Sequence, residues 1–396
     1  MTLNDWLNLL LRWTHLIAGI AWIGSSFYFI WLDQHLERTV AGDDGEVEGR
    51  LWMVHSGGFY RVERRRIGPG RMPEVLHWFK WEAALTWASG LLLLAVVYYL
   101  TGGIYLVDPM LARLKPAGAA GLGLGTIAVA WFVYDAIWAG PLSRRPALAT
   151  ALTLALIAGA TILFCRLLSG RAAFIHVGAM LGTIMVANVW QRILPSQQRM
   201  IDATAAGRTP DFGESDRAKT RSVHNSYFTF PVLFIMLSNH FPAVYGIAAN
   251  TLALALIGAA GAAARHVMIG RGASRGWALA GTVAGLAAVA LLTRPTAAGW
   301  GRTTALPGPA PAFAEVREIV QSRCGTCHSR TPSQPGFAAP PGGVTFDRAD
   351  EIRRLSMRIY QRAVVTRTMP LANMTGITDA ERATLGRWVE HGAPAR

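Results

Sequence analysis

A Cys324-Gly-Thr-Cys327-His328 motif near the C-terminus offers the clearest chemistry in the chain. Two thiols two residues apart, followed directly by an imidazole, are the signature of covalent c-type haem attachment. The two thiols would add to the haem vinyl groups, and the imidazole would bind the iron. Cys165 is the only other cysteine, so no second Cys pair completes a zinc site. A thioredoxin-like redox pair is the other interpretation, but such pairs follow a strand and lack the adjacent histidine.

The residues on either side of this motif predict a small helical domain. Residues 313–323 have the apolar spacing of a short amphipathic helix that leads the chain into the motif. A Pro/Gly-rich loop follows at 331–343, and a second helix is expected over about 348–365. A last helix begins with a capping box formed by Thr378 and Glu381. This arrangement is typical of a class I-like cytochrome c domain.

Met369 is the predicted sixth ligand of the haem iron. It lies in a Thr-Met-Pro sequence, and a thioether opposite the histidine suits a low-spin haem that transfers electrons. Pro370 would stiffen the ligand loop because its ring fixes its own φ angle. Met374 is the alternative ligand. Met369 is favoured because domains of this type usually carry a methionine directly before a proline.

The part of the chain before residue 294 has the composition of a membrane protein. Of all 396 residues, 52% are hydrophobic and only 16% are charged, whereas soluble proteins have about a quarter charged residues. The apolar runs are long enough to span a bilayer. They predict eight transmembrane helices, over about 6–32, 77–101, 119–140, 147–168, 172–193, 224–241, 243–264 and 276–293. The expected fold class is all-α, with an eight-span helical bundle at 1–293, a linker at 294–312 and the cytochrome c domain at 313–396.

The basic residues predict how the chain is oriented in the membrane. A net charge of +14 could indicate nucleic-acid binding, but the arginines lie mainly between apolar runs, so no nucleic-acid partner is expected. They gather in the loops 33–76, 141–146 and 194–223 and in the turn after the seventh run, which includes Arg265. Such loops stay in the cytoplasm. Both termini then lie in the periplasm of a bacterial cytoplasmic membrane, the side on which haem c is attached.

Three histidines within the predicted spans fall toward the periplasmic side: His15, His176 and His240. Ionisable residues inside a bilayer are costly, so they are functional candidates by default. A pair of these histidines could hold a b-type haem or another metal as a second redox centre.

A second group of polar residues falls toward the cytoplasmic side. His77, Arg192 and His224 lie near span ends, where they could simply extend to lipid headgroups. Asp135 lies deeper in its span, so a passive role is less expected for it.

Five segments carry a resemblance to a known family: Trp13-Thr-His-Leu-Ile-Ala-Gly-Ile-Ala-Trp-Ile-Gly24, His55-Ser-Gly-Gly-Phe-Tyr60, Leu76-His-Trp-Phe-Lys-Trp-Glu82, His224-Asn-Ser-Tyr-Phe228 and Cys324-Gly-Thr-Cys-His328. Over nearly its full length the chain resembles the membrane-bound urate oxidases (urate hydroxylases) that carry a C-terminal cytochrome c domain. The resemblance implies oxidation of urate to 5-hydroxyisourate, with electrons passed to the attached haem c instead of oxygen, so that no hydrogen peroxide forms. A periplasmic or membrane-bound acceptor, such as a cytochrome c or a terminal oxidase, would receive them.

The resemblance does not assign catalytic residues, so the site is predicted from the chemistry of urate. Urate is a planar monoanion at neutral pH, and the guanidinium of Arg192 suits such an acceptor. His224 and His77 could act as general bases that take a urate N–H proton. Asp135 is predicted to orient a histidine, Asn225 to donate to the edge of the urate ring, and Phe228 to stack on its face.

Three other functions fit parts of this pattern. A membrane cytochrome that oxidises quinol or another small molecule would share the haem but need a different substrate pocket. A transporter with a regulatory cytochrome domain would move ions without net oxidation of a substrate. A passive membrane anchor would need one span instead of eight.

Overall fold

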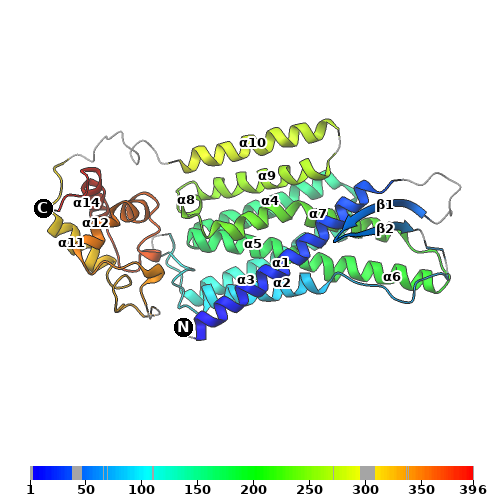
Figure 1. Cartoon of the computed structure of the whole chain (residues 1–396), viewed down its shortest axis with the longest axis horizontal. Helices are drawn as coiled ribbons and strands as arrows, with labels where there is room; N and C mark the ends of the chain where they lie inside the picture. Colours follow the sequence, from blue (N-terminus) through cyan, green and yellow to red (C-terminus); the bar gives the residue numbers. More distant parts are fainter. Residues whose placement is uncertain are drawn as a thin grey trace. The chain divides into compact units, whose positions relative to one another are not determined.

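The computed structural model describes residues 3–37, 47–65, 67–68, 70–108, 111–270, 272–294, 308–335, 337 and 339–395. Helices dominate this part of the chain (Figure 1). In the first 294 residues the α-helices are α1 (Leu3–His35), α2 (Trp81–Leu94), α3 (Pro116–Ala139), α4 (Pro146–Leu167), α5 (Gly170–Ala187), α6 (Leu194–Ala205), α7 (Phe212–Ser238), α8 (Pro242–Tyr245), α9 (Asn250–Ile269) and α10 (Ala273–Thr293). Two π-helical segments, η1 (Ala95–Tyr99) and η3 (Asn188–Ile193), continue α2 and α5.

Seven helices among the described residues are long and apolar enough to cross a membrane: α1, α2 with η1, α3, α4, α5 with η3 and α6, α9, and α10. The chain is therefore a helical, multi-pass membrane protein. Seven of the eight predicted spans coincide with these helices. The eighth, at 224–241, lies in α7, which does not reach the same apolar content. The reason is the polar first half of α7, which includes His224 and Asn225.

The predicted loop 33–76 contains a β-hairpin that the sequence did not predict, although the fold is otherwise helical, as expected. Strand β1 (Val47–His55) pairs antiparallel with β2 (Gly58–Arg65), and His55 pairs with Gly58 at the turn. The two turn residues have positive φ angles, 49° at Ser56 and 76° at Gly57. A two-residue turn of this handedness matches the twist of hairpin strands. The Ser-Gly pair between two apolar stretches was the sequence signal for it.

Two other segments that were predicted as loops are partly helical: 194–223 and the turn after the seventh predicted span. The segment 194–223 contains α6, which continues from α5 through η3, and the first turns of α7. Pro195 lies in the first turn of α6, directly after the π-helical segment η3. The predicted span 243–264 begins later, at Asn250, and α9 runs on to Ile269. Arg265 was expected in the turn after this span, but it lies inside α9 and is buried.

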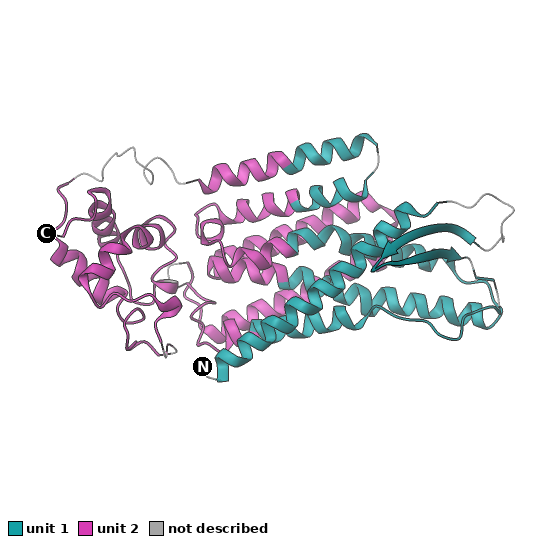
Figure 2. Ribbon diagram, in the orientation of Figure 1, with its two compact units in different colours: residues 1–94, 179–232, 261–282 teal, residues 95–178, 233–260, 283–396 magenta. Residues whose placement is uncertain are grey.

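The chain divides into two compact units (Figure 2). Unit 1 comprises residues 1–94, 179–232 and 261–282, and unit 2 comprises 95–178, 233–260 and 283–396. Unit 2 thus contains the C-terminal region together with parts of the membrane helices. The predicted boundaries at 1–293 and 313–396 do not follow this division and stay a prediction. Most of the predicted linker 294–312 lies outside the described residues.

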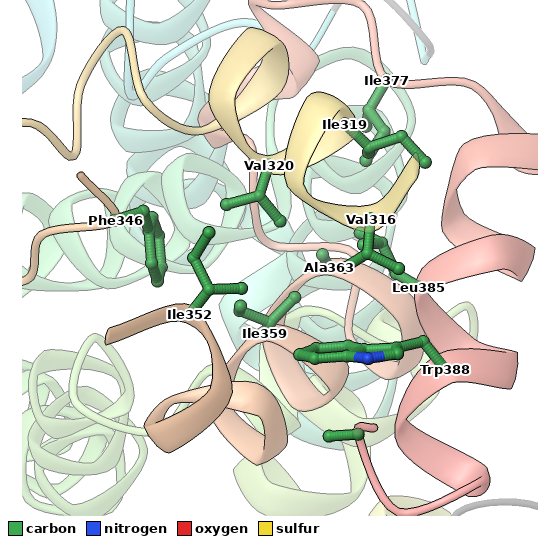
Figure 3. Close-up of a cluster of buried hydrophobic side chains, with 11 residues drawn as sticks. Val316, Ile319, Val320, Phe346, Ile352, Ile359, Ala363, Ile377, Leu385 and Trp388 are labelled. Atoms are coloured by element: carbon green, nitrogen blue, oxygen red, sulfur yellow. The ribbon is translucent and has the colours of Figure 1, made fainter. Parts of the chain in front are cut away.

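The C-terminal region of unit 2 has its own apolar core. Its helices are α11 (Phe313–Arg323), α12 (Ala349–Arg354), α13 (Ser356–Ile359) and α14 (Asp379–Glu390), with a π-helical turn η5 (Tyr360–Val365). The predicted helix 313–323 is confirmed, whereas 348–365 is broken into α12, α13 and η5. Figure 3 shows the core, made of Val316, Ile319, Val320, Phe346, Ile352, Ile359, Ala363, Ile377, Leu385, Trp388 and Ala393.

The predicted capping box fixes the start of α14. The Glu381 amide donates to the Thr378 hydroxyl at 3.2 Å, and the Thr378 amide donates to the Glu381 carboxylate at 2.7 Å. Both bonds satisfy amides that the helix itself leaves unpaired. The helix then presents the fully buried Trp388 to the core.

Candidate functional site

Unit 2 contains a cavity of about 950 Å³ that is lined in part by the Cys-Gly-Thr-Cys-His motif. Cys324, Cys327, His328 and Met369 all line it, as the sequence predicts for a haem site. Its volume lies near the upper end of the range for small-molecule and cofactor sites. Met374, the alternative ligand, is not among the lining residues and is 37% exposed. The cavity therefore favours Met369 as the methionine ligand.

Helix α11 and the turn after it position the motif. The His328 amide donates to the Cys324 carbonyl at 2.9 Å, which winds the two thiols and the imidazole into one helical turn. The His328 ring donates from Nδ1 to the Val344 carbonyl at 3.0 Å, because a carbonyl can only accept. Nε2 is then the nitrogen with a free lone pair. A metal-binding histidine needs this tautomer, and its second hydrogen bond holds the ring in place.

Burial sets the protonation states of the motif. It lowers the pKa of His328, although the hydrogen bond to Val344 opposes this effect, so the imidazole is neutral as a metal ligand must be. Burial also raises the pKa of Cys324 to about 12, so this side chain is a protonated thiol. On the opposite side, Arg382 donates to the Met369 carbonyl at 2.9 Å and fixes the methionine loop. The residues present thus fit a covalently attached haem.

Another wall of the same cavity comes from the ends of membrane helices and their connections. Tyr105, Arg171, Asn239 and Tyr245 line it. His240, which the sequence suggested for a second redox centre, lies exposed on this wall. All these residues belong to unit 2. The cavity thus joins residues from the membrane-spanning and the C-terminal parts of the chain.

A buried Tyr–His pair lies deeper in unit 2. His176 on α5 is fully buried, and its Nδ1 donates to the Ala172 carbonyl at 2.8 Å. Nε2 is therefore the acceptor for the hydroxyl of Tyr99, at 2.9 Å. Both ring nitrogens of His176 are thus used by protein groups in this arrangement. Gly123 on α3 lies against the pair and leaves room for the ring.

Gly123→Ala is expected to destabilise the membrane part by about 1–3 kcal/mol through overpacking. A Cβ atom at this position would lie 2.6 Å from Nε2 and Cδ2 of the buried His176 ring. The thermal unfolding midpoint of the detergent-solubilised protein measures the effect. Gly121→Ala is the matched control on the same helix, since its Cβ would meet nothing within 4 Å. Equal midpoints for the two variants would contradict this reading of the contact.

His15, the third of the periplasmic-side histidines, lies in unit 1. Its Nδ1 donates to the Thr86 carbonyl at 2.9 Å and lies 3.2 Å from the Ser89 hydroxyl. Within the described ranges, no three His, Cys, Asp or Glu side chains gather as a metal site. A b-type haem needs only two histidines, so it stays a prediction.

Unit 1 contains a polar cluster between η3 and α7. Asn188, fully buried on η3, donates to the Asn225 side-chain oxygen at 2.9 Å. Asn225 in turn donates to the Met185 carbonyl at 2.9 Å, and Arg221 lies 3.4 Å from the Asn188 oxygen. Arg221 is only 4% exposed. The cluster thus places a buried guanidinium beside two amides, at one of the π-helical insertions that often mark functional sites.

The residues that the sequence predicted for the urate site are spread over both units. His224 and Phe228 are half-buried on α7, near Arg221 and Asn225 along the same helix. Arg192 lies on η3 and His77 just before α2, and both are exposed. Asp135 is half-buried on α3 and belongs to unit 2, whereas the other residues belong to unit 1.

Sequence reasoning missed Asn188 and Arg221. The spacing could have identified Arg221, because it lies three and four residues before His224 and Asn225 and so shares a helix face with them. Two other buried atoms of unit 1 have no hydrogen-bond partner among the described residues: Glu82 Oε2 and Trp190 Nε1. Buried polar atoms without a partner are rare and indicate strain, bound water or function.

Arg265 is a second buried arginine of unit 1, at 1% exposure. Its Nε donates to the Ser226 hydroxyl at 2.8 Å, and its guanidinium lies 3.9 Å from the centre of the Phe27 ring. Its Nη2 has no hydrogen-bond partner in the described part of the chain. One buried arginine thus lies on α7 itself, and the other contacts α7 through Ser226.

The model of the urate oxidase N-terminal family matches residues 1–294. This range ends one residue after α10 and includes the polar cluster of unit 1. It excludes the Cys-Gly-Thr-Cys-His motif, so the interpretation of that motif depends on its own residues. Neither a curated protein nor a solved structure matches the chain.

Proposed function

The chain belongs to the urate oxidase N-terminal family, and on this premise we propose that its membrane part oxidises urate to 5-hydroxyisourate. In this reaction urate and one water give the hydroxylated product, two protons and two electrons. The observation that carries the proposal is the family match, joined by the buried Arg–Asn cluster within the matched range. The proposed class is an oxidoreductase embedded in the lipid bilayer.

The polar cluster of unit 1 supplies the groups that urate binding needs. Arg221 would hold the planar monoanion, because a guanidinium fork matches such an acceptor and the interaction is strong when buried. Asn188 and Asn225 hold the guanidinium in place and offer amide donors and acceptors to the ring edge. His224, one turn from Arg221, would accept a urate N–H proton as electrons leave. Water would then add to the oxidised C5 atom.

Arg192, the residue first predicted for the anion, remains the rival cation, and His77 remains the rival base. Both side chains are exposed in this structure, whereas Arg221 is only 4% exposed. A buried cation contributes more binding energy per contact than an exposed one. We therefore place Arg221 and His224 ahead of them, with Phe228 as the stacking partner on the same helix. Asp135 belongs to unit 2, so its role as an orienting carboxylate stays a prediction from the sequence.

The C-terminal part of unit 2 would hold a haem c through Cys324, Cys327, His328 and Met369. Such a group, when bound, accepts and donates single electrons. Electrons would continue to a periplasmic cytochrome c or a terminal oxidase, so hydrogen peroxide would not be a product. This scheme requires the C-terminal part to lie in the periplasm of a bacterial cytoplasmic membrane, as the loop charges predict.

Anaerobic addition of urate to the detergent-solubilised protein tests the proposal. The visible spectrum should show a reduced c-type α-band while the ultraviolet absorbance of urate declines, because no oxygen is present to take the electrons. Two haem equivalents should be reduced for each urate consumed. A quinol added in place of urate is the control for a general cytochrome reductase. An unchanged spectrum with intact haem would overturn the proposal.

A further inference from the structure

The cavity in unit 2 has one wall that the haem motif does not provide. Its membrane-side residues include Arg171 at the start of α5 and Asn239 just after α7. The two walls are in close contact beside the methionine ligand. A Cβ atom on Gly246 would lie 2.7 Å from the Thr368 side chain and 2.9 Å from the Thr366 carbonyl. No residue larger than glycine fits at position 246 without moving that loop.

Arg171 is held in a fixed orientation by neutral groups. Its Nε donates to the Asn239 side-chain oxygen at 3.0 Å, and the Tyr98 hydroxyl donates to the same oxygen at 3.3 Å. Its guanidinium lies 4.8 Å from the ring centre of Tyr105 and 5.9 Å from that of Tyr98. An amide and two aromatic rings orient the positive charge but do not neutralise it. This half-buried cation thus faces the cavity with its charge uncompensated by these contacts.

The other arginines of the cavity are placed differently. Arg358 and Arg362 are exposed to solvent. Arg323 and Arg367 form ion pairs at 2.9 Å, with Glu381 and Asp379 respectively. Water or a carboxylate therefore already stabilises their charges. Arg171 is the lining arginine with both partial burial and a neutral, pre-organised environment. Such a site favours a carboxylate or another small oxyanion.

We propose that Arg171, oriented by Asn239, binds a carboxylate of the haem, so that the membrane helices complete the haem site. This inference rests on the proposed attachment of haem to the Cys-Gly-Thr-Cys-His motif. The guanidinium stabilises the ferrous form, which carries one positive charge fewer than the ferric form. Arg171 is thus a positioning residue for the cofactor, and the C-terminal part works docked on the membrane part.

The reduction potential of the haem in the full-length protein tests this proposal. Arg171→Gln should retain covalent haem on a denaturing gel but shift the potential to more negative values. At a fixed applied potential the ferric-to-ferrous ratio should rise on the order of tenfold, the effect of removing one charge from a partly buried site. The reduction potential of Arg171→Lys, which keeps the charge, should lie between those of Arg171→Gln and the wild type. Arg166→Gln is the matched control, because Arg166 is exposed and does not line the cavity.

Three outcomes would overturn the proposal. The first is a wild-type potential in Arg171→Gln with full haem content. The second is a potential of the wild-type protein that changes with added inorganic phosphate, which would assign Arg171 to a free anion. The third is an unchanged potential in Asn239→Leu, a variant that removes the hydrogen-bond acceptor of the Arg171 guanidinium. This variant also serves as the test if Arg171→Gln does not accumulate. If the wild-type protein carried no covalent haem, this result would instead contradict the proposed function itself.

Discussion

Replacing Cys324 and Cys327 together by serine is expected to abolish covalent haem attachment and, with it, all urate-dependent reduction in the visible spectrum. Serine hydroxyls cannot form the thioether bonds through which Cys324 and Cys327 would hold the haem. The core residues on α11 and α14, among them Val316 and Trp388, do not line the cavity and should keep the domain partly folded. Haem-stained denaturing gels and the oxidised-minus-reduced spectrum measure the loss.

Cys165→Ala is the matched control for this pair, since it removes the third cysteine of the chain. Cys165 is buried on α4 and is not among the cavity-lining residues. Its replacement should leave haem content unchanged. Covalent haem that persists in the double serine variant would show that the motif does not attach it.

Arg221→Gln is expected to lower kcat/KM for urate on the order of a hundredfold, because a charge-assisted hydrogen bond in a buried site is lost. Glutamine is shorter than arginine but keeps the aliphatic stem and a neutral amide, so the helix packing should survive. Steady-state oxidation of urate, with an artificial one-electron acceptor, measures the change. The control is that the haem content and the thermal unfolding midpoint of the variant equal those of the wild type, which shows that the fold is intact.

Arg192→Gln is the comparison for Arg221→Gln. Arg192 lies four residues after Asn188 on the same π-helical segment but is exposed, so its loss should reduce kcat/KM only a few-fold. If Arg192→Gln causes the larger loss, the anion binds at the residue that sequence reasoning first selected. Equal activity of Arg221→Gln and wild type would remove Arg221 from the site.

The sequence predicted best what depends on short-range pattern. The Cys-Gly-Thr-Cys-His turn, the bounds of α11 and the cap of α14 each depend on residues within one helical turn, and all were found as expected. Seven of the eight predicted apolar spans were also found, since bilayer length is a composition signal. The choice of Met369 over Met374 agrees with the lining of the cavity.

The candidate urate site was predicted only in part, because it depends on contacts between distant segments. Asn225 was selected from a motif, but its partner Asn188 lies 37 residues away on a π-helical segment. A π-turn inserts one residue into a helix and rotates the later turns of that helix, and no residue type announces it. Arg265 was taken for a loop charge because arginine usually ends a span. Only the packing of α9 against Phe27 and Ser226 shows that it is buried.

The length of one helix bears on how a charged molecule reaches unit 1. From Gly170 to Ala205 the helix runs without interruption for 36 residues, which at 1.5 Å per residue is about 54 Å. The hydrocarbon layer is only about 30 Å thick, so the polar end, α6, must project into water. Asn188 lies about 27 Å along this axis from Gly170, at the far boundary of the hydrocarbon. A hydrophilic purine anion would meet Arg221 at headgroup depth and would never have to dissolve in lipid.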